Sequence, residues 1–328
     1  MRPQEEAFMG RVTALLAAAT ILALVVLAAP AHATFPGRNG LIVFGAETRR
    51  SGYELFTVQP DGRDLTRLTH LDGDAVQPDW SPDATQIVFE LDHMDGPVFC
   101  SIELMDVDTG DITDLTTARN PSGWSGCERQ PSFTPDGTRI VFIHFDDTTD
   151  VESIWSMNLT GANRVEISSD TGHGADDPNV SPDGSTMSFI AFNGKDLGQA
   201  LMTSAIDGTN VQRIVPFRLD VAIKQDWAPD GLHIVFTDNA DRFTKPANIA
   251  TVAPDGGDLT YLTHFRKPTH RAYVGGYSPN GRWIVFRIEI GDRAGLFRMH
   301  PDGSAVKTII PMSAFRPRFT DWGAAAAG

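Results

Sequence analysis

The stretch QPDWSPDATQIVF at residues 77–89 decides the fold, because similar stretches return along the chain. Each copy joins a strand-like run to an apolar triplet through a Pro-Asp-Gly-like turn. In that turn Pro sets φ, Asp bonds its own backbone and Gly takes a positive φ. The further copies are QPSFTPDGTRIVF (130–142), DPNVSPDGSTMSF (177–189), KQDWAPDGLHIVF (224–236) and VGGYSPNGRWIVF (274–286). A unit that repeats in this way indicates a repeat architecture.

Each repeat predicts four strands, which we name A to D in chain order. Strand A opens the stretch, and strand B is the apolar triplet that ends at Phe44, Phe89, Phe142, Phe189, Phe236 and Phe286. Strand C is a run such as ELFTV (54–58), and strand D follows a second tight turn as a run such as LTRLT (65–69). Alternating apolar residues and turn chemistry indicate β-structure throughout. Six four-stranded units predict an all-β fold, a six-bladed β-propeller.

The two ends of the repeat series predict how the ring closes. The first copy has no strand A before LIVF (41–44), and a spare A-type strand, PRFTDW, stands at 317–322. Joining the spare strand to the first blade leaves no open edge. We therefore expect a single domain, residues 34–328, with repeats at approximately 35–80, 81–133, 134–180, 181–227, 228–277 and 278–322.

The W-S-P-D-G-x-x-I-x-F unit, with its C–D hairpin at Asp-Gly, resembles the propeller repeat of the TolB family. The resemblance covers essentially all of residues 34–328. It implies the propeller fold and says little about function, because this fold is reused widely. TolB itself resembles a two-domain protein with an α/β domain before its propeller, and prolyl oligopeptidases join similar propellers to an α/β-hydrolase. We expect neither partner domain here.

The amino terminus is typical of an export signal. Arg2 and Arg11 precede the apolar run at 12–29, and AHA (31–33) has the small residues of a cleavage site. We predict that residues 1–33 are a signal peptide and that the protein is secreted or periplasmic, in the cell envelope. The alternative is an uncleaved anchor, because the apolar run approaches the roughly 20 residues that span a bilayer. A membrane contact is expected only in that case.

Net charge and cysteine content narrow the choice of partners and compartment. The formal charge of −15 repels phosphate backbones, so nucleic acid is not an expected partner. Cys100 and Cys127 are the two cysteines, and exported proteins lie where thiols oxidise. We predict a disulfide between them. A metal site would need more ligands of this kind, and a nucleophilic cysteine would need a suitably placed histidine.

The strand order places the connections on two faces. The A–B and C–D turns share what we call the short-turn face, and the longer B–C and D–A connections share the long-loop face. Long loops on a rigid scaffold usually carry function. The repeated turn aspartates are interpreted as scaffold; they are Asp83, Asp136, Asp183 and Asp230.

Charges on the long-loop face are divided by sign. One D–A loop is basic and another is acidic, and they do not belong to neighbouring blades. We expect a bipolar face that suits a peptide or protein loop with separated charges, although ordinary solvated loop charge is the alternative. The candidate binding residues are Arg266, Lys267, His270, Arg271, Arg316, Arg318 and the aromatic Trp124, which suits stacking or packs over the disulfide.

The acidic loop also suggests a metal site. The candidate ligands for a divalent cation are Asp170, His173, Asp176 and Asp177. Some similar propellers, such as oligogalacturonate lyase, hold a metal with histidines at the channel mouth, and His70, His173, His264 and His270 fall in D–A loops here. The sequence has no G-x-S-x-G, H-E-x-x-H or phosphate-loop motif.

These patterns together favour a monomeric, non-catalytic binding module without a required cofactor. Its expected ligand is a protein or peptide partner in the envelope or outside the cell. The alternative is a metal-dependent lyase or hydrolase that acts on an acidic saccharide. A third hypothesis is an envelope scaffold in which the propeller only spaces other proteins.

Overall fold

The described part of the chain is built almost entirely from β-strands. The computed structural model describes residues 37–48, 52–93, 100–116, 126–168, 174–192, 198–239 and 244–326. The predicted signal peptide lies outside these residues. Within them, no helix is long and apolar enough to cross a membrane. A short 3₁₀ helix, η2, covers Phe217–Leu219.

The described strands form six antiparallel sheets of four strands each, which we number as blades 1 to 6. Blade 1 contains β24 (Pro317–Ala324), β1 (Asn39–Thr48), β2 (Gly52–Val58) and β3 (Thr66–Arg67), and blade 2 contains β4 (Asp74–Trp80), β5 (Gln86–Asp92), β6 (Cys100–Asp106) and β7 (Ile112–Asp114). Blade 3 contains β8 (Cys127–Phe133), β9 (Arg139–Asp146), β10 (Val151–Asn158) and β11 (Val165–Ser168). Blade 4 contains β12 (Gly174–Val180), β13 (Thr186–Phe192), β14 (Gln199–Ala205) and β15 (Gln212–Val215). Blade 5 contains β16 (Asp226–Trp227), β17 (Ile234–Asp238), β18 (Asn248–Val252) and β19 (Thr260–Tyr261), and blade 6 contains β20 (His270–Tyr277), β21 (Ile284–Ile290), β22 (Arg293–Met299) and β23 (Lys307–Ser313).

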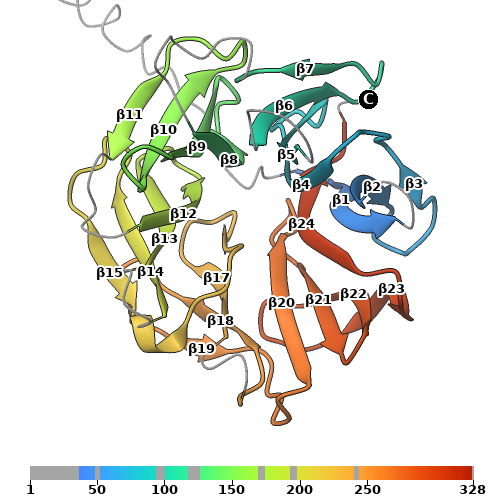
Figure 1. Cartoon of the computed structure of the whole chain (residues 1–328). Helices are drawn as coiled ribbons and strands as arrows, with labels where there is room; N and C mark the ends of the chain where they lie inside the picture. The colour runs from blue at the N-terminus through green and yellow to red at the C-terminus, as the bar shows by residue number, and fades with distance from the viewer. Residues whose placement is uncertain are drawn as a thin grey trace, which may run out of the picture. The chain divides into compact units, whose positions relative to one another are not determined.

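The six blades stand in a ring, with one inner strand from each blade beside its axis, which we call the channel (Figure 1). The inner strands are the predicted A strands. The prediction of ring closure is confirmed, because β24 pairs with β1 in blade 1, with Trp322 opposite Ile42 and Asp321 opposite Val43. The predicted six-bladed, all-β fold is confirmed as well.

The apolar triplets form the core between neighbouring blades. The final phenylalanine of each triplet is among the largest fully buried side chains, as the alternation of strand B requires. Each phenylalanine packs with apolar residues of the adjacent blade; Phe286, for example, lies in one cluster with Ile249 and Val235. The core is therefore a ring of six inter-blade layers among the described residues rather than one central mass.

Aspartates of the inner strands join the blades to one another. The Asp79 carboxylate accepts a hydrogen bond from the Phe133 backbone N–H at 2.8 Å. Asp321 does the same for Trp80 at 2.9 Å and Asp226 for Tyr277 at 2.6 Å. Each aspartate thus satisfies a buried backbone donor of the next blade, which is costly to leave unpaired.

The turn aspartates act as the sequence suggested. The backbone N–H two residues later donates to Asp83, Asp136, Asp183 and Asp230 at 3.0 to 3.1 Å. These bonds are the local side-chain contacts expected of Asx turns. The carboxylates therefore stabilise the A–B turns of the short-turn face.

Cys100 and Cys127 form the predicted disulfide, with a Cα–Cα distance of 5.1 Å. Cys100 begins β6 in blade 2 and Cys127 begins β8 in blade 3, so the bond joins neighbouring blades at the long-loop face. A disulfide of this kind is consistent with an oxidising compartment.

Candidate functional site at the long-loop face

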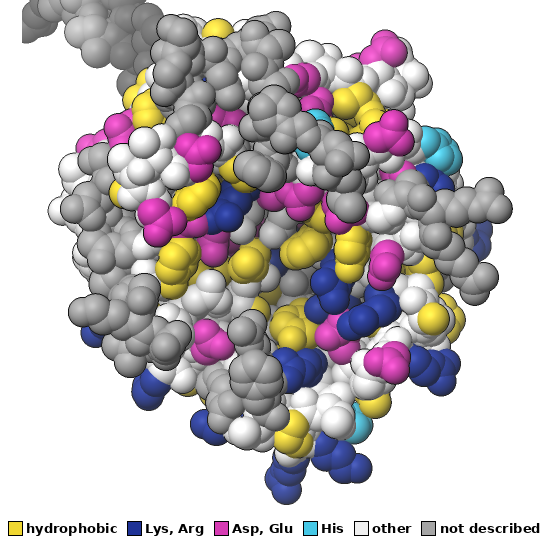
Figure 2. Space-filling view, in the orientation of Figure 1, with side chains coloured by type: hydrophobic (Ala, Val, Ile, Leu, Met, Phe, Trp, Pro, Cys, Tyr) yellow, Lys and Arg dark blue, Asp and Glu magenta, His cyan; other side chains and the backbone are white. Residues whose placement is uncertain are grey.

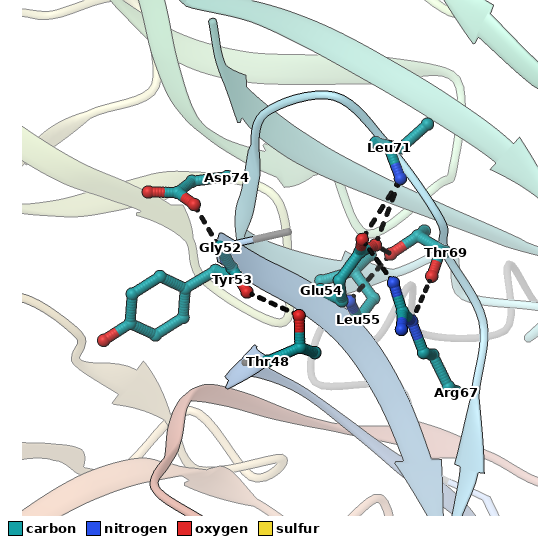
Figure 3. A network of polar contacts seen from close by, with 9 residues as sticks. All are labelled: Thr48, Gly52, Tyr53, Glu54, Leu55, Arg67, Thr69, Leu71 and Asp74. Carbon is teal, nitrogen blue, oxygen red and sulfur yellow. Dashed lines mark hydrogen bonds and ion pairs between the residues drawn. The ribbon is translucent and has the colours of Figure 1, made fainter. Parts of the chain in front are cut away.

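The described D–A connections are fixed by buried polar contacts at their start. Figure 3 shows the contacts in blade 1, where the fully buried Glu54 accepts from Arg67 at 2.6 Å and from the Thr69 hydroxyl at 2.5 Å. The same hydroxyl accepts the Leu55 N–H at 2.9 Å. Thr116 and Thr263 accept the equivalent N–H groups of strand C in blades 2 and 5. The long loops therefore leave the outer strands from a rigid base.

A pocket opens where the long loops enter the inner strands β20 and β24. Its empty volume, including the part open to solvent, is about 330 Å³, and its lining includes Arg287, Arg318, Tyr273 and Lys224. Figure 2 shows Lys and Arg side chains gathered off-centre on this face. The pocket is thus lined by three cationic side chains, those of Lys224, Arg287 and Arg318.

Arg287 of the pocket shares one carboxylate with a nearby arginine, Arg316. The Glu289 Oε1 atom lies 3.3 Å from Arg287 Nη2 and 3.0 Å from Arg316 Nη2. Burial lowers the pKa of Arg287 to about 10, although Glu289 opposes this shift, and the positive charges of Arg318 and Arg316 add to it. The guanidinium groups of Arg287, Arg316 and Arg318 therefore outnumber the carboxylate that is ion-paired with them, and positive charge is in excess.

Arg318, the third arginine of the group, lies beside an aromatic ring. Its Cζ atom is 5.7 Å from the centre of the Tyr53 ring, close enough for a cation–π contact. The Tyr53 backbone is held in turn by Asp74, which accepts its N–H at 2.7 Å (Figure 3). Among the described residues, the Nε atoms of Arg287, Arg316 and Arg318 are buried without a hydrogen-bond partner.

Tyr273 connects the pocket to the basic D–A loop. The Arg287 guanidinium lies 4.5 Å from the centre of its ring, and Arg271 Nη1 donates to its hydroxyl at 3.2 Å. Arg271 also reaches Asn239 at 3.4 Å. The predicted binding residue Arg271 therefore belongs to the wall of aromatic and cationic groups that continues into the pocket.

The lining of the pocket also includes a buried lysine, Lys224, that stands among carboxylates. Burial alone would lower the pKa of Lys224, but Asp177, Asp321 and Asp79 raise it above its ordinary value. Burial also raises the pKa of Asp79 well above its usual range, and Asp321 adds to this shift. The charge of Lys224 is consequently balanced by nearby aspartates of the protein, whereas Arg287, Arg316 and Arg318 have one ion-paired carboxylate among the described residues.

The opposite side of the channel mouth is acidic. Arg129 forms an ion pair with Glu152 and lies 3.6 Å from Asp176, and its guanidinium lies over the Phe145 ring. Burial raises the pKa of Asp176 to about 6, against the pull of Arg129. Near it, Glu90 accepts the Gln130 N–H at 2.9 Å.

Glu90 is expected to make stability depend on pH. Burial, and then the Asp92 carboxylate, raise its pKa to about 8. A carboxyl whose pKa is higher in the folded than in the unfolded state stabilises the fold while protonated, and this contribution is lost as the pH rises from about 4.5 through about 8. We expect the free energy of unfolding to fall over that interval, and Glu90→Gln to flatten the fall. Urea denaturation from pH 5 to 8.5 measures the free energy of unfolding, and Glu166→Gln, at an exposed position, is the control. Equal slopes of this free energy against pH in the wild type and both variants would contradict the raised pKa of Glu90.

The predicted binding residues fall into three groups. Arg318 lines the pocket, Arg271 contacts the lining residue Tyr273, and Arg316 shares Glu289 with the lining residue Arg287. Arg266 and Lys267 are exposed on the rim, and His270 contacts the Thr269 hydroxyl at 3.1 Å and the edge of the Phe265 ring. Trp124 lies outside the described residues.

The metal hypothesis remains a prediction. Asp170 and His173 lie outside the described residues. Asp176 faces Arg129, and Asp177 accepts the Gln225 N–H at 2.8 Å, so both have structural contacts. In the ranges that the structure describes, the one group with metal-ligand spacing is Glu90, Asp92 and Cys100, and the Cys100 sulfur belongs to the disulfide. His70, His264 and His270 are not part of it.

Sequence reasoning missed Arg287 and Glu289, which carry the pocket. Both stand in strand B, where we expected only core. A signal was present, because the residue after the recurring phenylalanine is Gly, Ile or Thr in four repeats but charged in two, as Glu90 and Arg287. That position faces the inner strand of the next blade, as the Thr237 bond to the Val274 N–H illustrates.

Comparison with known proteins supports the fold assignment. The family described as "TolB beta propeller domain" (PD40) matches residues 100–326. The Tol-Pal system protein TolB of Francisella tularensis is 25% identical over 217 residues, which cover 65% of this chain and 46% of that protein. An uncharacterized protein of Agrobacterium fabrum is 30% identical over 165 residues, 47% of this chain and 50% of that one. The chain thus spans about half the length of these two relatives.

Among solved structures, TolB from Acinetobacter baumannii superposes with a TM-score of 0.70. The two are 21% identical, and the superposition covers 88% of this chain and 68% of that one. At this identity the likeness concerns the fold alone. The arginine pocket must therefore be interpreted from its own geometry.

Proposed function

Because the chain belongs to the TolB beta-propeller family, we propose that it is an exported, non-catalytic module that binds a protein or peptide partner through its long-loop face. The observation that carries this proposal is the arginine pocket at the channel mouth, with its buried Nε groups that have no partner among the described residues. An N–H donor or a positive charge that is buried without a partner costs free energy, and a bound ligand that supplies an acceptor or a negative charge would remove this cost.

The distribution of charge supports a partner that carries separated charges. Arginines and a tyrosine line one side of the mouth, and Glu152, Asp176 and Glu90 stand on the other side. Complementary charge steers association and fixes orientation more than it adds affinity. A rigid ring with long loops on one face suits such recognition. The envelope or the exterior of the cell remains the proposed location, and the disulfide is consistent with it.

Reversing charge on the basic rim should weaken partner binding without unfolding the protein. We expect the triple change Arg266→Glu, Lys267→Glu and Arg271→Glu to reduce association about tenfold or more and to flatten its salt dependence. Partner association is measured with the mature chain and envelope extract at two salt concentrations. Arg282→Glu, on an exposed A–B turn of the short-turn face, is the control.

Two outcomes of that experiment would oppose the proposal. One is unchanged association in the triple variant, and the other is an equal loss in the Arg282 control. The enzyme alternative, a metal-dependent lyase or hydrolase acting on an acidic saccharide, makes a different prediction. It requires stoichiometric metal in the purified protein and loss of that metal on His264→Ala, which elemental analysis measures.

A further inference from the structure

We propose that the cavity between Arg287 and Arg318 is a receptor for one carboxylate group of the partner, either an acidic side chain or a chain end. This inference rests on the proposed function for the identity of the partner. The preference for a carboxylate follows from the charge of the pocket, its size and the direction of its hydrogen-bond donors. None of these three depends on which molecule carries the carboxylate.

Charge is the first reason. The guanidinium groups of Arg287, Arg316 and Arg318 act on one another, and among the described residues Glu289 is the one carboxylate that forms an ion pair with them, so the group has an excess of positive charge. Asp292 acts on Arg316 without forming such a pair. Lys224 does not add to this excess, because four nearby aspartates counter its charge. Buried charges of one sign are strongly unfavourable unless a counter-charge accompanies them. The occupant should therefore be an anion.

Size is the second reason. The pocket has a cavity volume of about 40 Å³ and is partly open to solvent. A single water needs at least roughly 10–15 Å³ measured in this way, so the cavity accommodates about three waters. A carboxylate has three heavy atoms, whereas a sugar ring or a nucleotide base is far larger. The cavity thus admits a terminal acidic group while the body of the ligand stays on the face outside.

The direction of the donors is the third reason. Glu289 already shows that Arg287 and Arg316 can meet on one carboxylate oxygen, at 3.3 and 3.0 Å. Arg318 contacts the Tyr53 ring and carries a buried Nε without a partner in the described residues. A planar guanidinium pairs with a carboxylate through two parallel N–H bonds. Arg318 is therefore the residue assigned to the incoming group, and Arg287 closes the cavity behind it.

The test uses isothermal titration calorimetry of the mature protein with two capped tripeptides. Acetyl-triglutamate amide is the probe, and acetyl-triglutamine amide has the same shape without charge. We expect the acidic peptide to bind and the neutral one to bind at least tenfold more weakly. Arg318→Gln should remove that difference, Arg318→Lys should restore only part of it because lysine lacks the planar fork, and Arg282→Gln should change nothing.

Several results would overturn the inference. Equal binding of the two peptides would do so, and so would a preference that survives Arg318→Gln in a variant whose melting temperature is unchanged. Inorganic phosphate that displaces the acidic peptide at equal or lower concentration would show a general anion site rather than a carboxylate receptor. If the acidic peptide binds through Arg318 while the rim triple variant retains its partner, the pocket stands and the proposed function fails. If the rim triple variant loses its partner while the two peptides bind equally, the proposed function stands and the carboxylate receptor fails.

Discussion

A chain that ends at Pro311 should aggregate or fail to reach the medium, because it lacks the whole of β24. That strand supplies the inner edge of blade 1, pairing with β1 from Asn39 to Ala46. Its loss exposes unpaired backbone groups that template association with other chains. It also removes the buried Trp322 and the Asp321 carboxylate that accepts the Trp80 N–H.

A graded variant tests the same closure in a chain of full length. Trp322→Ala should lower the free energy of unfolding by about 3–5 kcal/mol, the usual range for removing a large buried side chain. A chain that ends at Ala326 keeps all of β24 and is the control. Soluble yield, size-exclusion chromatography and thermal unfolding measure the effect. Normal yield and an unchanged melting temperature for the chain ending at Pro311 would show that β24 does not close the ring.

Gly161→Ala should destabilise the protein far more than Gly110→Ala, although both glycines lie in C–D turns with a left-handed backbone. Their φ angles are similar, +74° and +77°, so the left-handed backbone penalty of about 1–2 kcal/mol is shared. A Cβ atom at Gly161 would lie 2.0 Å from the Leu115 carbonyl oxygen of blade 2, whereas at Gly110 nothing lies within 4 Å. We expect a further loss of about 2–3 kcal/mol at Gly161, which is large for a single substitution.

The glycine pair tests how the blades contact each other at their outer edges. At Gly62, Gly208 and Gly303 too, a Cβ atom would lie within 3 Å of a carbonyl oxygen of the preceding blade, so close approach is a repeated feature. Urea denaturation of the two alanine variants gives the difference directly. Equal losses would mean that only backbone conformation, and not the contact with Leu115, requires glycine here.

The fold was predictable because each repeat follows the same local rules. Turn residues, alternation and the spare strand at 317–322 all point to one closed ring, and the structure has that ring. The disulfide was predictable from two cysteines and an export-type terminus. What the pattern could not reveal is the use of Asp79, Asp226 and Asp321, which serve neither turn nor solvent but hold backbone donors of the next blade.

The site was predictable only in part, for a physical reason. Charges in loops, such as Arg266 and Lys267, are visible in a sequence but lie on the rim. Arg287 is hidden in a strand, and its role depends on which residue of the neighbouring blade 1 lines the same pocket, namely Arg318. Contacts between blades bring together residues that are far apart in the sequence, and the repeat pattern within one blade does not predict which residues meet. A charged residue that interrupts the repeat consensus is the signal to look for.

The central claim, that the long-loop face receives the partner, can be tested by site-specific photo-crosslinking in the cells that produce the protein. The photoreactive residue p-benzoylphenylalanine replaces exposed or partly buried apolar side chains, which leaves the charges intact. On the long-loop face the positions are Ile290, 41% exposed, and Phe265 on the basic loop; on the short-turn face they are Leu232 and Val306, 62% and 55% exposed. We predict a discrete crosslinked partner from Ile290 or Phe265 and none from Leu232 or Val306. The same partner crosslinked from Leu232 or Val306, with none from Ile290 and Phe265, would contradict the account.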